Sequence, residues 1–282
     1  MAKSKFYYVF LLIILFPAMS NAQEGLTLMK QMLEKNKTIK TLKYTMIMQE
    51  RIKGKFFKTK MDNKINVSPL KVYFKQEYPD KDLELLFVTG WNENRCKIKK
   101  SRLIKLNLDP FGSLIRKNQH NTIYCSGFTY TFNVMEFLLK KYGDDKAKNI
   151  VKNDGLVKTE DGTICYKITL EEPNFKYFNY TIKKGETIST VAKKYFVSEY
   201  MILENNPACD WYDDVKEGQV IKVPEIYCKK MVLYLNKATT MPAIIKLYDE
   251  KGLFEQYEFY NLIINPVFAP SEFNPDFPGY GF

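Results

Sequence analysis

Residues 180–224 switch twice between the residue spacing of a strand and that of a helix, and this feature constrains the fold more than any other. The segment begins as a strand, takes helical spacing from Ile188, reaches Asn-Asn-Pro at Pro207 and closes on a second strand that ends at Pro224. The flanking segments 163–172 and 229–250 alternate apolar and polar side chains, as strands do. We therefore predict a compact βααβ unit that replaces a hairpin turn in a β-rich domain. The ends of a compact unit lie close together, so a sheet accepts an insertion at such a place.

The unit, bounded at residues 179–225, resembles a LysM domain. The positions that carry the resemblance are Tyr180, Ile182, Gly185-Glu186-Thr187-Ile188, Val191-Ala192, Tyr195, Val197-Ser198, Ile202-Leu203, Asn206-Pro207, Gly218-Gln219, Val220 and Pro224. The resemblance implies binding of glycans that contain N-acetylglucosamine, mainly peptidoglycan in bacteria. By the same resemblance, the glycan groove lies between the loop after the first strand and the loop before the second.

The resemblance places the glycan-binding residues on those two loops. They are Gly185, Glu186, Thr187, Ile188, Asn206, Pro207 and Ala208, with Trp211 as a candidate sugar platform peculiar to this sequence. Backbone amides and carbonyls would bond the acetamido groups. Two other interpretations stay open: these residues only make the fold, or the acidic, aromatic loop 208–214 has turned the unit into a protein-interaction module.

The rest of the chain after residue 22 predicts an α+β fold of antiparallel strands and helices. An amphipathic helix over 24–37 is followed by period-two strands, a helix over about 131–142 and further strands. Residues 23–176 and 227–282 loosely resemble the LolA lipoprotein carriers and an uncharacterised envelope family of that fold. The resemblance rests on segments 68–76, 84–95, 108–128 and 261–282. The resemblance implies a curved, open antiparallel sheet, a half-barrel that wraps around helices, with an apolar cavity for acyl chains; a filled core is the alternative.

Residues 1–22 are predicted to be a signal peptide. A basic start precedes an apolar run over 6–16, which is too short to span a bilayer as a helix. Ser20 and Ala22 are small residues at the −3 and −1 positions of a cleavage site, and no Cys follows for a lipid anchor. We expect an exported protein of the periplasm of a Gram-negative bacterium, soluble after cleavage and without a transmembrane helix. An uncleaved anchor is the alternative.

The chain has a net charge of +11, of which Lys3 and Lys5 in the first 22 residues supply +2, so the mature chain is +9 and the domain that surrounds the insert is about +10. Residues 180–224 hold six Lys and seven Asp or Glu, so the positive excess lies elsewhere. A basic exported protein suits anionic lipid headgroups or the anionic cell wall, or is basic for solubility alone. Nucleic acid is the weaker interpretation, since the Lys residues are scattered and the protein is exported.

The five cysteines show no metal-binding spacing, so we predict no metal site and no cofactor. They are Cys96, Cys125, Cys165, Cys209 and Cys228. Their number is odd, so at least one thiol is unpaired or pairs between chains. A Cys209–Cys228 disulfide is one expectation, and buried free thiols are the other.

No catalytic motif accompanies the single histidine, His120, which lies five residues before Cys125. Glu171 and Glu172 are adjacent on a strand and therefore point to opposite faces, unlike a glycosidase pair. We predict a binding protein and not an enzyme: its LysM unit recognises glycan and tethers a LolA-like domain at the wall. A periplasmic carrier or sensor for lipid or acylated protein is the alternative, and a hydrolase that uses His120 is a weaker one.

Overall fold

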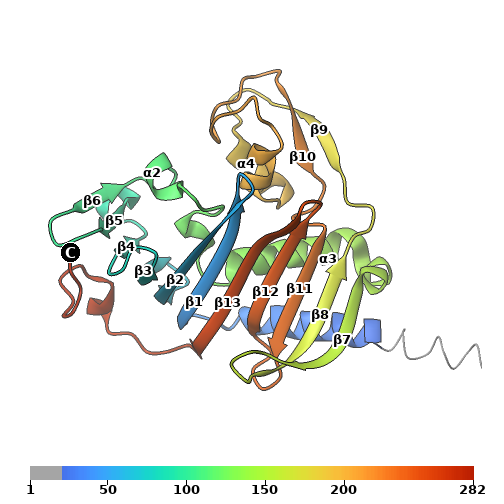
Figure 1. The fold of residues 1–282 in the computed structure, drawn as a ribbon, viewed down its shortest axis with the longest axis horizontal. Helices are drawn as coiled ribbons and strands as arrows, with labels where there is room; N and C mark the ends of the chain where they lie inside the picture. Colours follow the sequence, from blue (N-terminus) through green and yellow to red (C-terminus); the bar gives the residue numbers. More distant parts are fainter. Residues whose placement is uncertain (1–20) are drawn as a thin grey trace, which may run out of the picture.

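The computed structural model describes residues 21–282. The predicted signal peptide, residues 1–22, lies outside the described residues except for its last two positions, which belong to a helix that continues to residue 36. Figure 1 shows a large twisted sheet with helices behind it and a small separate unit above the ends of its central strands. Among residues 21–282, no helix combines the length and apolar character needed to cross a membrane.

One antiparallel sheet of 11 strands dominates the fold, in the order β6-β5-β4-β3-β2-β1-β13-β12-β11-β8-β7. Its strands are β1 (Thr41–Ile52), β2 (Lys55–Asn66), β3 (Lys71–Tyr78), β4 (Glu84–Val88), β5 (Cys96–Lys99), β6 (Lys105–Leu108), β7 (Val151–Lys158), β8 (Ile164–Glu171), β11 (Lys230–Asn236), β12 (Pro242–Asp249) and β13 (Gly252–Ile264). The sheet is open, since β6 and β7 are its two edges. The predicted α+β class with an open antiparallel sheet is confirmed.

Local chemistry explains the long β1–β2 hairpin. Its two-residue turn is Lys53-Gly54, and both residues have positive φ, 49° and 76°. A two-residue turn of this kind matches the right-handed twist of the strands it joins. The turn places the ends of β1 and β2 beside the inserted unit, where the backbone N–H of Lys53 donates to the Tyr200 hydroxyl at 2.8 Å.

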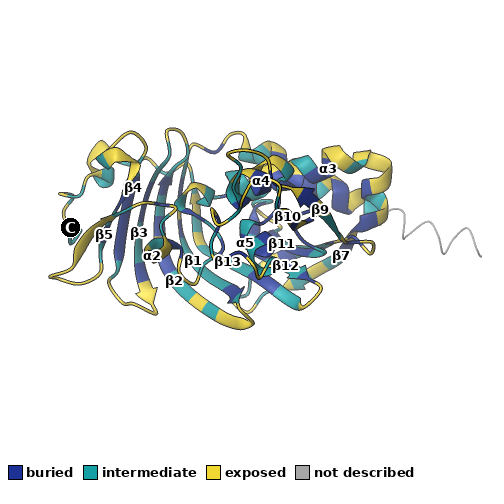
Figure 2. Cartoon of the chain, turned by 90° about the horizontal axis from the view of Figure 1, so that it is seen from above, coloured by how far each residue is buried: buried dark blue, intermediate teal, exposed yellow. Residues whose placement is uncertain are grey.

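The core lies between the sheet and two helices, residues 21–36 and α3 (Thr129–Ile150). Its fully buried side chains come from both layers and include Leu26, Met29, Met32, Phe87, Phe128, Phe132, Met135 and Phe254. Figure 2 shows the helices buried on the sheet side and exposed on the other. The predicted N-terminal amphipathic helix is confirmed.

The second helix is longer than the predicted 131–142. Gly143 has a φ of 68° and a ψ of 166°, which breaks the helix, and a further stretch then continues to Ile150. Because Gly-Asp-Asp at 143–145 has the composition of a turn, the sequence predicted strands after residue 142, and the second stretch of helix was missed. The extension ends directly at β7, where Ala147 and Ile150 are buried.

The inserted unit is a two-stranded sheet of β9 (Tyr177–Thr181) and β10 (Val220–Pro224), covered by α4 (Ile188–Tyr195) and α5 (Glu199–Glu204). It has its own apolar cluster, including Ile182, Ile188 and Val191. On either side of it, β8 and β11 pair directly, with Glu171 opposite Lys230. The insertion therefore does replace a hairpin turn. The domain bounds 179–225 stay a prediction.

All five cysteines are free thiols, so the Cys209–Cys228 disulfide expectation is wrong. Cys209 is buried in the cluster of the inserted unit, and Cys228 is buried in the core of the main domain. The two residues flank β10, but they belong to different cores.

The C-terminal segment after β13 packs over the face of β2–β4 that points away from the helices. Tyr280 stacks on Tyr73 with ring centroids 3.7 Å apart, and Lys64 pairs with Glu272 at 2.6 Å. This segment, which showed no sequence period, adds a short third layer over strands that no long helix covers.

Candidate functional site

The loop after β9 holds four of the predicted glycan-binding positions. Gly185 has a φ of 76°, in the region that favours glycine, and a Cβ there would meet nothing within 4 Å. Glu186 points back into the unit and accepts hydrogen bonds from the Tyr180 hydroxyl at 2.8 Å and the Lys183 N–H at 2.9 Å. The Lys183 bond lowers the pKa of the Glu186 carboxyl. Glu186 therefore shapes the loop, while Gly185 leaves its backbone open.

The next two positions begin the first helix. Thr187 is the N-cap of α4, and its hydroxyl accepts from the Thr190 N–H while the Thr190 hydroxyl accepts from the Thr187 N–H. Such a cap stabilises a helix by about 1 kcal/mol. Ile188 is fully buried, and its N–H donates to the Tyr212 carbonyl at 2.8 Å. That bond joins the first loop to the second.

The loop after α5 is held to β10 by Asn206. Its side-chain amide donates to the Lys222 carbonyl and its side-chain oxygen accepts from the Lys222 N–H, both at 2.8 Å. Pro207 and Ala208 follow as exposed residues. Trp211 is half-buried and packs edge-on against Tyr212, with centroids 5.0 Å apart. The structure thus brings both loops together, with Gly185, Pro207 and Ala208 facing solvent.

Helix α5 fixes the inserted unit to the main domain. Arg116, on α2 (Ser113–Arg116), pairs with Glu199 at 2.9 Å, and Arg51 pairs with Glu204 at 3.4 Å. Arg116 is also stacked over the Tyr212 ring at 3.4 Å from its centroid. Because Arg51 and Arg116 are both buried, the unit is docked through charged contacts that exclude solvent.

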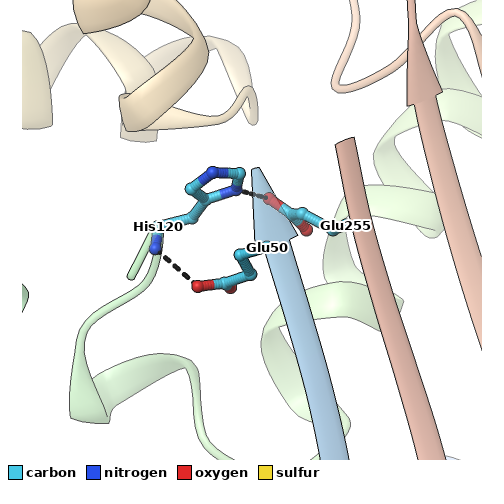
Figure 3. Close-up of side chains that lie close together, drawn as sticks. All are labelled: Glu50, His120 and Glu255. Atoms are coloured by element: carbon cyan, nitrogen blue, oxygen red, sulfur yellow. Dashed lines mark hydrogen bonds and ion pairs between the residues drawn. The ribbon is translucent and has the colours of Figure 1, made fainter. Parts of the chain in front are cut away.

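A buried Glu-His-Glu cluster lies directly beneath this docking contact (Figure 3). His120 donates its backbone N–H to Glu50 at 2.8 Å, and its ring Nδ1 lies 2.8 Å from Glu255 Oε1. The ring stacks on Tyr200 of α5, with centroids 4.3 Å apart, and also packs against Phe254 of β13, with centroids 4.2 Å apart. The three polar side chains come from β1, a loop and β13, yet all are buried.

Both ring nitrogens of His120 face oxygen acceptors. Nδ1 faces Glu255, and Nε2 lies 2.8 Å from the Arg51 carbonyl. Both nitrogens can donate only when the ring is the charged imidazolium. Burial alone would lower the pKa of His120, but the charge of Glu50 and the bond to Glu255 raise it overall. Burial also raises the pKa of Glu50, which the nearby His120 partly offsets.

The ligand atoms of these three residues lie within 4.8 Å of one another, close enough to hold a metal ion. The imidazolium already lies between the two carboxyl groups and offsets one negative charge, and the Tyr257 hydroxyl donates to Glu50 at 2.7 Å. We therefore assign the cluster a structural role. The sequence shows no catalytic motif around His120, and it gives no sign of the two carboxylates, which are 70 and 135 residues away.

The other candidate chemistry finds no support in the geometry. Burial raises the pKa of the Cys125 thiol to about 12, so it is not an activated nucleophile. Glu171 is exposed, whereas Glu172 is buried and accepts from the Tyr142 hydroxyl at 2.6 Å. The two neighbours face opposite sides and form no catalytic pair.

A cavity of about 570 Å³ lies on the inner face of β1–β5, under the loop that carries α2. Its walls are mainly apolar and include Met46, Phe57, Met61, Phe74, Leu85 and Leu106. Polar groups from Gln76, Asn121, Glu255 and Tyr257 also reach it. Pockets that bind small ligands have volumes of about 300–1,000 Å³ and this mixture of walls. The space between the inner face of the sheet and the loop that carries α2 is therefore not filled by side chains.

Residues 39–199 match the family described as a protein of unknown function, DUF1571. The chain belongs to the DUF1571 family. Residues 180–224 of this DUF1571 protein match the LysM domain, which confirms the predicted LysM unit. LysM domains bind glycans, so glycan binding is the class of function that the unit implies. No functionally curated protein matches the chain.

Several solved structures share the general arrangement of the DUF1571 protein at low similarity. A DUF1329 family protein from Desulfovibrio piger is 9% identical, with a TM-score of 0.32 over 90% of this chain and 97% of that one. The Mycobacterium tuberculosis lipoprotein LppX is 14% identical, with a TM-score of 0.40 over 87% and 98%. A domain named for outer membrane lipoprotein sorting, from Vibrio parahaemolyticus, is 12% identical, with a TM-score of 0.32 over 90% and 97%. Similarity at this level says nothing of function.

The charge state of His120 makes the stability of the DUF1571 protein depend on pH. Its folded pKa lies above the unfolded value of about 6.5, so its stabilising contribution is complete below that pH and is lost as pH rises through the folded pKa. The raised pKa of Glu50 acts in the same direction. Urea unfolding should show the free energy of unfolding falling as pH rises above about 6.5. His120→Gln should flatten that slope, and an equal slope in both proteins would contradict the assignment.

Proposed function

We propose that this chain is an exported, periplasmic protein that binds peptidoglycan through its LysM unit and is not an enzyme. The observation that carries the proposal is that the LysM unit docks on the main domain through one face and leaves its predicted glycan loops exposed on another. The α5 side is docked on the main domain, while Gly185, Pro207 and Ala208 are exposed on the two loops that the family resemblance assigns to glycan. The tether would then hold the main domain at the wall in one fixed orientation.

Free backbone groups at these loops suit the acetamido groups of N-acetylglucosamine. Within residues 21–282, the N–H and C=O of Gly185 and of Ala208 have no hydrogen-bond partner. An acetamido group offers one donor and one acceptor, which main-chain groups can match without a charged side chain. Glu186, Thr187, Ile188 and Asn206 would position that backbone, and Trp211 would lie at the edge of the groove.

Titration with soluble chitin oligosaccharides tests this site. Ala208→Trp should weaken binding at least tenfold, or about 1.4 kcal/mol, because a large ring at this exposed position would fill the groove. Ala238→Trp, a matched change in the exposed turn between β11 and β12, should leave the affinity unchanged. Equal affinity of both variants and the parent chain would place the glycan elsewhere.

A second function is favoured by the 570 Å³ cavity: binding of a lipid or of the acyl chain of an acylated protein. Its methionine and aromatic walls suit a flexible apolar chain, because Met side chains adapt their shape. The protein purified without detergent should carry a lipid detectable by mass spectrometry. Met46→Trp, which narrows the cavity, should abolish that signal, and Ile263→Trp, on the exposed surface of β13, should keep it. A parent chain that carries no lipid would argue against a carrier.

A further inference from the structure

We propose that the edge of the sheet around β5, β6 and α2 is a docking surface for an anionic lipid bilayer. This proposal is independent of glycan binding by the LysM unit. It concerns a group of residues that we call the rim: Lys100, Arg102, Leu103, Ile104, Lys105, Leu106, Phe111, Leu114 and Lys117.

The rim exposes large apolar side chains that the fold leaves without cover. Leu103 is 92% exposed and Leu114 is 73% exposed, and Ile104, Leu106 and Phe111 are also exposed. Single exposed apolar residues are ordinary, but five within twelve positions of the chain are not. A soluble protein keeps such a group where it meets an apolar partner.

Charge identifies the partner. Residues 95–118 contain eight Lys or Arg and a single acid, Asp109. Among the described residues, Lys100, Arg102, Lys105 and Lys117 have no acidic partner within 4.0 Å. Unpaired basic groups beside exposed Leu and Phe match an interface with apolar chains below and phosphate headgroups above. A protein partner would have to be both strongly acidic and apolar, so the bilayer is the simpler fit.

The rim also forms one wall of the cavity. Lys100, Leu106, Leu114 and Lys117 belong to both. A bilayer docked on the rim would therefore lie next to the cavity. An apolar chain could then pass from the bilayer into the cavity with little exposure to water. In Figure 1 the β5–β6 hairpin lies well apart from β9 and β10, whereas α2 reaches the inserted unit through Arg116, which contacts Glu199 and Tyr212.

Co-sedimentation of the mature chain with lipid vesicles tests the proposal. We expect binding to vesicles of phosphatidylcholine with phosphatidylglycerol, weakening as salt is added, and little binding to phosphatidylcholine alone. Each basic residue near an anionic surface contributes roughly five-fold in affinity, so K100E/R102E/K105E should lose on the order of 100-fold. Leu103→Asp with Leu114→Asp should lose roughly tenfold or more, because the apolar contacts are removed.

Matched changes at the opposite edge of the sheet are the controls. Leu156→Asp and Lys158→Glu, on exposed positions of β7, should bind vesicles like the parent chain. All these sites are exposed, so the variants should fold, which their urea unfolding curves would verify. Unchanged binding by the two leucine changes would overturn insertion of the rim. Binding of the parent to isolated cell-wall polymer through the rim, but not to vesicles, would overturn the bilayer as partner.

Discussion

Replacement of His120 by alanine should lower the free energy of unfolding by about 3–5 kcal/mol at pH 7, because it leaves buried carboxylates without their cation. Glu50 and Glu255 are both about 1% exposed or less and both contact His120 directly. The change also removes the ring that packs against Tyr200 and Phe254. Urea unfolding of the parent chain and the variant measures the difference.

A double-mutant comparison separates charge from lost packing. In a chain that already carries Glu50→Gln and Glu255→Gln, the His120→Ala change should cost at least 1 kcal/mol less than in the parent, because the uncompensated charges are gone. An equal cost in both backgrounds would show that the histidine acts only through its stacked ring. A cost below about 1 kcal/mol in the parent would contradict the buried ion cluster altogether.

Replacement of Arg51 by alanine should destabilise the chain by a similar amount and loosen the LysM unit. Arg51 donates to both oxygens of the buried Asp249, to the Leu253 carbonyl at 3.1 Å and to Glu204 on α5 at 3.4 Å. Its loss leaves Asp249 buried and unpaired, which costs about 3–5 kcal/mol. We also expect faster proteolysis in the connections 172–176 and 225–229, where the unit joins the sheet.

The matched control is Lys251→Ala. Lys251 pairs with the same Glu204 oxygen at 3.1 Å, but its side chain is 54% exposed. An exposed pair contributes about 0–1 kcal/mol, so this variant should unfold and resist protease much like the parent. Comparable losses in the two variants would mean that burial of the Arg51 pair is not what holds the unit in place.

Features that depend on local sequence period could be predicted; those that depend on distant contacts could not. The βααβ pattern from Tyr180 to Pro224, the Lys53-Gly54 turn and the pairing of the flanking strands all follow from short-range chemistry. The prediction ended this helix at residue 142 and not at Ile150 because Gly143 does break it. The seven residues that follow Gly143 are too few to show a clear helical period.

The glycan residues illustrate the limit of a family pattern. It names Glu186, Thr187 and Asn206, but only the structure shows that their side chains already bond Lys183, Thr190 and Lys222. No period in the sequence links His120 to Glu50 and Glu255, because three elements far apart in the chain meet only in the folded sheet. The docking of α5 is hidden for the same reason, since its partners lie near residues 51 and 116.

The most direct test of the central claim is sedimentation of residues 23–282, the predicted mature chain, with purified peptidoglycan sacculi. The parent chain and the Ala238→Trp control should pellet with the sacculi, and Ala208→Trp should stay in solution. Intact folding of each protein is established beforehand from its unfolding transition. A folded parent chain that remains in the supernatant would contradict peptidoglycan binding by this LysM unit.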